Sequence, residues 1–200
     1  TCTAVKRLYL HEEIAGPFLE RLKDRIGGFR LGNGLDPSVD MGPLVSRTQR
    51  EKVAAVVDQV QEMQMGTILT GGCPPPGDAF SHGFFYEPTL ITDPEPDAPV
   101  LTDEVFGPVL PIMTVSDLDA AIEEANRTRY GLGASIWTKN LDVAQTFFSQ
   151  VEAGVVWVNR HLNVPPEMPF GGVKESGIGR ENGLQAYYAY SRTKSIFMGR

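Results

Sequence analysis

Short apolar runs alternate along this chain with longer stretches in which apolar residues recur every three or four positions. The first pattern is typical of strands, and the second is typical of helices that bury one face. Because helices are the usual connections between parallel strands, the alternation predicts an α/β fold: an open, mostly parallel, twisted sheet flanked by helices. Strands are expected at residues 5–10, 67–70, 85–91, 109–115, 133–138 and 155–158, the last of which is apolar throughout, as in the middle of a parallel sheet.

The expected helices have recognisable start and stop signals. Acids, or side chains that accept hydrogen bonds from free N–H groups, favour a helix N-terminus, and glycine favours the other end. The start signals are Glu12 and Glu13 for the first helix, Ser46 with Gln49 as a capping box for the second, Ser116 for the third and Asn140 for the fourth. The stop signals are the glycines at positions 27, 28, 66 and 154. The second helix is expected to bury a stripe formed by Val53, Val56, Val57, Val60 and Met63.

Proline and glycine mark the stretches that should be irregular. Residues 71–83 contain three consecutive prolines and are expected to form a surface loop. The prolines within 94–99 exclude a regular helix or a central strand there, and Pro111 indicates an edge or irregular position for its strand. Residues 165–183 are crowded with glycine and proline, and an extended segment at 193–198 has no later element to pair with.

The charge and the sparse metal-binding residues exclude several classes of function. The net charge of −7 disfavours binding to nucleic acid or to an anionic membrane, because phosphates would be repelled. Two cysteines are too few for a secreted disulfide scaffold, and three histidines lie too far apart in sequence to predict a metal site. No apolar run approaches the roughly 20 residues that span a bilayer, and no signal-peptide pattern is present. These features predict a cytoplasmic protein.

Four features are candidates for chemistry, and each has an ordinary structural alternative. Cys2, just before a strand, is either a nucleophile or a small buried hydrophobe. Glu104 precedes a Phe-Gly-Pro loop that would aim its carboxylate at a ligand, or it is a solvated loop acid. Asn159 ends a buried strand, where ligands bind in open α/β sheets, or it starts a turn. The glycines within 171–179 allow close approach to a ligand or to another subunit, although their spacing is not that of a phosphate loop.

Five ordered motifs resemble the aldehyde dehydrogenase superfamily over essentially the whole chain. They are Cys2-Thr3-Ala4-Val5-Lys6-Arg7, Asp36-Pro37 with Met41-Gly42-Pro43-Leu44, Glu104-Val105-Phe106-Gly107-Pro108, Tyr130-Gly131-Leu132, and the run 169–183. The last run matches the family signature Pro-Phe-Gly-Gly-x-Lys-x-Ser-Gly-x-Gly-Arg-Glu-x-Gly at every fixed position. The resemblance implies oxidation of a small-molecule aldehyde to a carboxylate with NAD or NADP.

The resemblance also implies a role for each matching residue of the catalytic and cofactor sites. Cys2 would be the nucleophile, whose thiolate attacks the aldehyde and forms first a thiohemiacetal and then a thioester. Glu104 would accept hydrogen bonds from the hydroxyls of the nicotinamide ribose, and Phe106 would pack near the nicotinamide. Gln49 and Lys52 match further positions that contact the cofactor.

The remaining matches concern the substrate and the assembly. Phe170 would line the substrate channel, with Asn159 near it. Residues 1–184 would form part of the catalytic domain, and residues 185–200 an oligomerisation segment. The strand at 193–198 would join the sheet of a neighbouring copy and form a homo-oligomer, a dimer or a tetramer.

The departures from the family pattern limit what the chain is expected to do. The family's general-base glutamate, oxyanion-hole asparagine and nucleotide-binding domain precede the cysteine, and here only Thr1 does. The chain is therefore expected to be a fragment without activity of its own. Arg192 stands where many members have an acid, two positions before Lys194, so ion pairs between subunits are expected to differ. The alternatives are a non-catalytic assembly domain of the same superfamily and an unrelated cysteine hydrolase, which would lack a histidine placed to activate Cys2.

Overall fold

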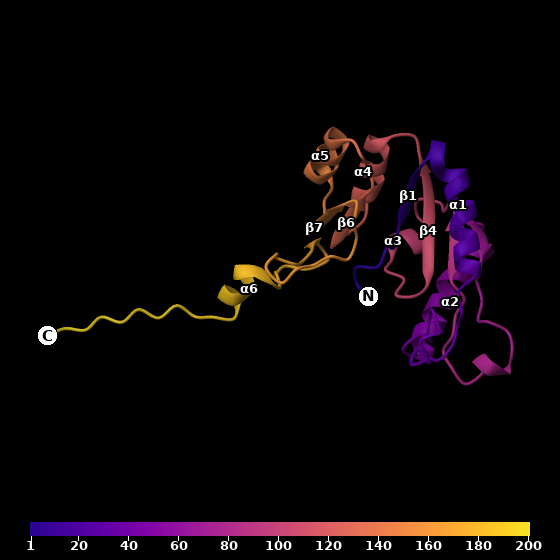
Figure 1. The fold of residues 1–200 in the computed structure, drawn as a ribbon, viewed down its shortest axis with the longest axis horizontal. Helices are drawn as coiled ribbons and strands as arrows, with labels where there is room; N and C mark the ends of the chain where they lie inside the picture. Colours follow the sequence, from indigo (N-terminus) through magenta and orange to yellow (C-terminus); the bar gives the residue numbers. More distant parts are fainter. The chain divides into compact units, whose positions relative to one another are not determined.

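The computed structural model describes residues 1–200, which form two compact units, Thr1–Ala121 and Ile122–Arg200. Figure 1 shows the succession of strands and helices along the chain. The first unit contains a four-stranded sheet in the order β1-β4-β3-β2. β4 is parallel to β1 and β3, and β2 is antiparallel to β3, so the predicted α/β class with a mostly parallel sheet is confirmed. The strands are β1 (Leu8–His11), β2 (Thr67–Thr70), β3 (Thr89–Thr92) and β4 (Val109–Val115).

Helices cover both faces of the four-stranded sheet. Successive residues of a strand point to opposite faces, and Leu90 and Ile91 of β3 accordingly belong to different cores. Ile91 packs in the core formed with α2 (Arg47–Glu62) and α3 (Pro99–Thr102). Leu90 packs in the core formed with α1 (Glu12–Gly27). Figure 1 shows α1 and α3 on opposite sides of β4.

The first two helices begin at side chains that accept hydrogen bonds from the first turn. His11 accepts from the backbone N–H of Glu13 at 3.3 Å, and the two acids that follow lie at the positive end of the helix dipole. Ser46 accepts from the N–H of Gln49 at 3.1 Å, as predicted. The reciprocal half of the predicted capping box is wrong, because the Gln49 amide donates elsewhere, to the carbonyl of Phe106.

The apolar stripe of α2 is confirmed except at its end. At most 1% of the side chain is exposed at Val53, Val57 and Val60. Met63 is 61% exposed instead, because α2 ends at Glu62, before the predicted stop at Gly66. The left-handed backbone at Gln64, with a φ of 55°, turns the chain away there.

Two inferences from proline are wrong, each for a local reason. Pro111 lies in β4, an interior strand rather than an edge strand. β1 begins at Leu8, opposite Ile112, so at Pro111 the ladder toward β1 has not yet started and no hydrogen bond is lost there. Pro99 does not exclude a helix but begins α3, where its fixed φ and missing N–H suit the first turn.

Several predicted elements are shorter in the structure. β1 begins three residues later than predicted, and β3 begins at Thr89 rather than at 85. The loop at 71–83 is confirmed and contains one short 3-10 helix, η1 (Asp78–Phe80). None of the helices combines the length and the apolar character that crossing a bilayer requires.

The second unit contains two separate two-stranded sheets, β5 with β8 and β6 with β7. The first pair is antiparallel and the second is parallel. β7 therefore has one neighbour in this chain and does not lie in the middle of a larger sheet. The elements are α4 (Leu118–Asn126), which crosses the boundary between the units, β5 (Tyr130–Gly131), β6 (Gly133–Ile136), α5 (Leu141–Gln150), β7 (Val155–Val158), β8 (Val173–Lys174) and α6 (Gly183–Ala189).

The caps of α4 and α5 were predicted with mixed success. Asn140 caps α5 as predicted and accepts from the N–H of Asp142 at 2.9 Å. Ser116 is not the cap of α4. Asp117 accepts from the N–H of Ala120 at 2.9 Å, while the Ser116 hydroxyl donates to the same carboxylate. The bond from Ala120, with the Ser116 hydroxyl, holds the pKa of Asp117 below its usual value.

The end of the chain differs most from the sequence prediction. α6 was not predicted, and it begins within the glycine-rich region at Gly183. Residues 191–200 form no helix or strand and are exposed throughout. The domain boundary expected at residue 184 and the pairing of 193–198 with another copy stay predictions.

Candidate active site

Three segments of the first unit meet at the loop that carries Glu104 and Phe106. The Lys6 ammonium donates to the carbonyl of Val105 at 2.7 Å and to that of Gly107 at 3.2 Å. The Gln49 amide of α2 donates to the carbonyl between them, that of Phe106, at 2.9 Å. Three successive carbonyls of this loop are therefore held by side chains from two other segments.

The parallel register of β1 and β4 explains why these segments meet. Leu8 pairs with Ile112, so the residues before Leu8 run beside the residues before Ile112. Cys2 and Lys6 precede β1, and the Glu104 loop precedes β4. The candidate residues thus lie toward the amino ends of two adjacent parallel strands.

The loop lies directly against α2, and this contact requires a glycine. A Cβ atom on Gly107 would lie 2.5 Å from Val53 Cγ2, far inside the van der Waals distance. Val105, two residues earlier, is 7% exposed and belongs to the core that α2 forms. The glycine of the Phe-Gly-Pro sequence therefore lets the loop pack closely against α2.

The candidate catalytic and cofactor side chains of this unit are exposed. Cys2 is exposed and lies in a turn in which the N–H of Ala4 donates to the carbonyl of Thr1 at 3.2 Å. Its interpretation as a small buried hydrophobe is therefore wrong. Glu104 is exposed, and the Phe106 side chain is 45% exposed. All three are accessible to a ligand.

The surroundings of Lys6 combine burial with favourable charge. Burial lowers the pKa of its ammonium, and the nearby Glu104 carboxylate acts in the opposite direction. The ammonium also lies 5.7 Å from the centre of the Phe106 ring, within the range of a cation–π contact. Lys6 thus contacts every residue of the loop from 105 to 107, and the carboxylate of Glu104 acts on its charge.

Gln49 and Lys52 lie on the same side of α2, because they are three residues apart in a helix. Lys52 is exposed and free for a ligand. The Gln49 amide is already bound to the Phe106 carbonyl, so in this structure it holds the loop rather than presenting a donor outward.

In the second unit, both the oxygen and the nitrogen of the Asn159 side chain form a hydrogen bond. It accepts from the N–H of Thr138 at 2.8 Å and donates to the Thr138 carbonyl at 2.7 Å. Its own N–H donates to Ile136, and its φ of 55° turns the chain after β7. This geometry favours the alternative in which Asn159 starts a turn.

The glycine-rich run approaches its own backbone. Phe170 is half-buried and pairs with Glu181 through two hydrogen bonds of 2.7 Å. A Cβ atom on Gly171 would lie 2.5 Å from the carbonyl oxygen of Gly179, and Arg180 donates to the carbonyl of Gly172 at 2.8 Å. The glycines at 171 and 172 therefore allow a close approach within the run itself, whereas a Cβ atom on Gly177 or Gly179 would meet nothing within 4 Å.

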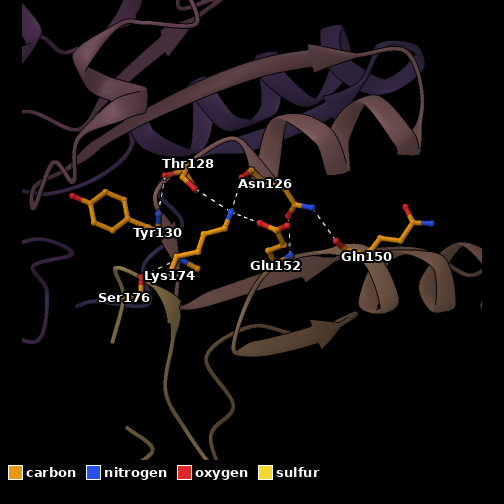
Figure 2. Close-up of polar contacts among 8 residues, drawn as sticks. Asn126, Thr128, Tyr130, Gln150, Glu152, Lys174 and Ser176 are labelled. Carbon is orange, nitrogen blue, oxygen red and sulfur yellow. Dashed lines mark hydrogen bonds and ion pairs between the residues drawn. The ribbon is translucent and has the colours of Figure 1, made fainter. Parts of the chain in front are cut away.

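A polar network anchors the same run, and only the fixed Lys and Ser of the signature pointed to it in the sequence. Figure 2 shows Lys174 pointing toward Asn126, Thr128 and Glu152. Its ammonium donates to the carbonyl of Asn126 at 2.6 Å and to that of Thr128 at 3.1 Å, and it forms an ion pair with Glu152.

Two further side chains complete this network. The Asn126 side chain accepts from the N–H of Glu152 at 2.7 Å and donates to the carbonyl of Gln150 at 2.8 Å. Ser176 accepts from the N–H of Gly131 at 3.0 Å, so both fixed polar residues of β8 and its turn bind backbone groups of the β5 region. The polar groups of these side chains therefore hold the backbone of the second unit together.

The structure divides the predicted site residues between its two units. Cys2, Gln49, Lys52, Glu104 and Phe106 belong to the first unit, and Phe170 and Asn159 belong to the second. A polar surface hollow lies elsewhere in the first unit, and none of the predicted site residues borders it; it is lined by Gln61, Thr67, Gly72, Cys73 and Glu95, among others.

The fold and the site define an α/β protein with an exposed thiol and a clamped, carboxylate-bearing loop at the amino ends of adjacent parallel strands. The model of the aldehyde dehydrogenase family matches residues 1–196. The chain belongs to the aldehyde dehydrogenase family.

Relatives and solved structures agree with this assignment. The betaine aldehyde dehydrogenase of Brucella anthropi is 38% identical over 197 residues, which are 98% of this chain and 40% of that protein. A betaine aldehyde dehydrogenase structure from Staphylococcus aureus in complex with NAD+ has a TM-score of 0.91 and 35% identity, over 95% of this chain and 38% of that one. The structure of PnpE with nicotinamide adenine dinucleotide has a TM-score of 0.91 and 41% identity, over 95% of this chain and 39% of that one. The chain thus spans about 40% of the length of the curated relatives that it matches.

Proposed function

We propose that this chain carries the nucleophile and part of the cofactor site of an NAD(P)-dependent aldehyde dehydrogenase, which oxidises an aldehyde to a carboxylate. The observation that carries the proposal is the joining of two exposed groups: the Cys2 segment is tied through Lys6 to the loop that bears Glu104. Membership of the family and the NAD-bound structures of its relatives support it. Because the chain spans about 40% of those relatives, the activity is proposed for the family protein in which this sequence stands.

In the proposed reaction, Cys2 acts as the nucleophile. Its thiolate forms a bond to the aldehyde carbon, and the carbonyl oxygen takes the electron pair to give a thiohemiacetal. A bound nicotinamide ring would supply the hydride acceptor that oxidises this carbon. The thioester left on Cys2 is then hydrolysed, which releases the carboxylate and restores the thiol.

The residues of the first unit fit the ribose and nicotinamide end of a dinucleotide. The exposed Glu104 carboxylate is an acceptor suited to a pair of ribose hydroxyls, and its loop is fixed on both sides. The Phe106 ring offers an accessible apolar surface, and Lys52 offers a free cation. Gln49 contributes by holding Phe106, and its amide would have to leave that carbonyl to contact a cofactor directly.

The second unit and the end of the chain contribute to the proposal in a more limited way. Phe170 is proposed to line the substrate channel, and its half-buried ring stays partly accessible. Asn159 is proposed to shape the neighbouring loop at 160–166 rather than to contact the aldehyde, since its amide is engaged. The proposal also includes a cytoplasmic location and a homo-oligomer formed through residues 193–198.

The test compares the two cysteines in the family protein that contains this sequence. Cys2→Ser should lower NAD(P)H formation at least about 1,000-fold while cofactor affinity is retained, because only the nucleophile is lost. Cys73→Ser is the matched control and should stay active. Betaine aldehyde is the first substrate to test, since the Brucella and Staphylococcus relatives bear its name.

Turnover that survives in Cys2→Ser would contradict the role of Cys2. A wild-type protein that oxidises no aldehyde would instead support the non-catalytic alternative.

A further inference from the structure

We propose that Lys6 is a positioning residue, which fixes the Glu104–Gly107 loop against the segment that carries Cys2. The inference rests on the proposed function for its catalytic consequence, and on the geometry of the first unit for the clamp itself. None of the motif matches assigns Lys6 a role of its own.

The contacts place Lys6 at the centre of the loop. Its ammonium binds the two carbonyls that flank Phe106, at 2.7 and 3.2 Å, across about one hundred residues of sequence. The Phe106 carbonyl between them is bound by Gln49 from α2. Successive carbonyls are thus held by different segments, and the loop cannot rotate toward either segment without breaking a hydrogen bond.

A lysine is well suited to this place. Its ammonium is compact and carries three donors, so one group can bind two converging carbonyls. The side chain is half-buried, where hydrogen bonds from a charged donor are stronger than in water. The Phe106 ring, 5.7 Å away, adds a third favourable contact for the charge.

The clamp matters for catalysis because Glu104 directly precedes Val105, the more tightly bound residue. If the loop shifts, the Glu104 carboxylate and the Phe106 ring shift with it. A misplacement of about 1 Å in a catalytic site can lower the rate about 100-fold. Lys6 would then affect the oxidation without touching the aldehyde.

The first experiment measures the clamp in the 200-residue chain itself, with a glutamate-specific protease. Cleavage of the Glu104–Val105 bond requires local opening of the loop, so its rate reports the open population. Lys6→Met keeps the apolar stem, removes the ammonium, and creates no new cleavage site. It should accelerate this cleavage about 10-fold or more, while the exposed Glu167–Met168 bond of the second unit serves as the internal reference.

Three further variants make this result specific. Lys6→Arg keeps a cation with several donors and should cleave at nearly the wild-type rate. Lys23→Met, which removes an exposed lysine of α1, should also stay at the wild-type rate. Gln49→Leu removes the hydrogen bond from α2 to the Phe106 carbonyl, and its side chain is partly exposed. This variant should therefore also accelerate cleavage of the Glu104–Val105 bond, even if Lys6→Met folds poorly. An unchanged rate in Lys6→Met and Gln49→Leu, or an equal acceleration in Lys23→Met, would overturn the clamp.

The second experiment tests whether Lys6 positions the loop for catalysis. It uses the family protein that contains this sequence, once its oxidation of an aldehyde has been measured. Lys6→Met should lower kcat at least about 10-fold with an unchanged KM for the aldehyde, and Lys6→Arg should recover most of it. If Lys6 had only a structural role, Lys6→Met would lower the stability and the fraction of active protein. The kcat per active enzyme would then stay unchanged. Wild-type kinetics in Lys6→Met, with accelerated cleavage, would refute positioning. If the wild-type protein oxidises no aldehyde, the proposed function fails while the cleavage result still decides the clamp.

Discussion

Cys73 shows how strongly the surroundings of one thiol set its chemistry. Its sulfur lies 3.7 Å from the Glu87 carboxylate, in an exposed loop. Partial burial raises the pKa of the Cys73 thiol, and the charge and hydrogen bond of Glu87 raise it further. A raised pKa leaves less thiolate at a given pH, so Cys73 should be a poor nucleophile near neutral pH.

The Glu87→Gln substitution tests this effect. Removing the carboxylate should lower the pKa of Cys73 toward its usual value. At a given pH near neutrality, a larger fraction of Cys73 should then be thiolate. Alkylation of Cys73 by iodoacetamide at pH 8 should become about threefold faster, with mass spectrometry distinguishing the two thiols. The alkylation rate of Cys2, in the same sample, is the control. A slower reaction of Cys73 in the variant would show that Glu87 acts in the opposite sense.

Glu104 is the second residue whose role depends on its charge and direction. In the family protein that contains this sequence, Glu104→Gln keeps the shape of the side chain and removes the carboxylate that is proposed to hold the ribose. Hydride transfer should slow about 100-fold, and cofactor affinity should change much less, because orientation is lost before binding is. Single-turnover absorbance at the reduced nicotinamide band measures this rate. Glu20→Gln, on the exposed face of α1, is the matched control. An unchanged single-turnover rate in Glu104→Gln would rule the role out.

At the scale of elements, the glycine-rich run is held against the end of α5 and β7 by a backbone contact. A Cβ atom on Gly154 would lie 1.8 Å from the carbonyl oxygen of Gly171, so at least one of the two backbones must move in an alanine variant. Gly154→Ala should therefore destabilise the second unit by about 2–3 kcal/mol. Gly179→Ala, where a Cβ atom would meet nothing within 4 Å, is the matched control from the same run.

Urea unfolding followed by tryptophan fluorescence suits this comparison. Both tryptophans, Trp137 and Trp157, belong to the second unit, and Trp157 is 4% exposed in β7. The fluorescence signal therefore reports the unfolding of the second unit, which contains both Gly154 and the glycine-rich run. Equal midpoints for Gly154→Ala and Gly179→Ala would mean that the two backbones are not in contact.

The same elements show what local sequence signals can predict. Apolar runs located six of the eight strands and missed the two-residue strands β5 and β8. Acids and hydrogen-bond acceptors located three of the four predicted helix starts. Both signals are local. Pro111 misled the prediction because what a proline costs in a strand depends on where the neighbouring strand begins. α6 was missed because its start at Gly183 lies within a run whose glycines favour a loop.

The sequence motifs name candidate site residues one by one, but they do not predict how those residues are arranged. The motifs singled out Cys2, Glu104 and Phe106, and the structure adds that all three are exposed and belong to the first unit. Nothing local in the sequence pairs Lys6 with Val105, which is 99 positions away, because that contact follows from the register of β1 with β4. The hydrogen bond from the Gln49 amide to the Phe106 carbonyl was not foreseen either, because the two residues lie 57 positions apart and meet only when α2 packs against the loop.

At the scale of the whole molecule, the end of the chain exposes an unusual amount of apolar surface. The exposed fraction is 91% at Tyr190, 95% at Phe197 and 92% at Met198. The backbone of residues 192–200 forms no strand within this chain and no hydrogen bond to another backbone group. Apolar side chains beside unpaired backbone groups favour pairing with another strand, as expected for an oligomerisation segment.

The 200-residue chain should therefore fold and associate while showing no NAD(P)-dependent oxidation by itself. Each unit has a hydrogen-bonded sheet and the first has cores on both faces of its sheet, so folding has a local basis. Light scattering should give a mass above that of the monomer, and deleting residues 192–200 should shift it toward the monomer, because the pairing segment is removed. Phe197→Ser is a milder variant with the same expected direction. A chain that stays monomeric at all concentrations would contradict the assembly role of this segment, and clear NAD(P)H formation by the chain alone would show that these residues suffice for catalysis.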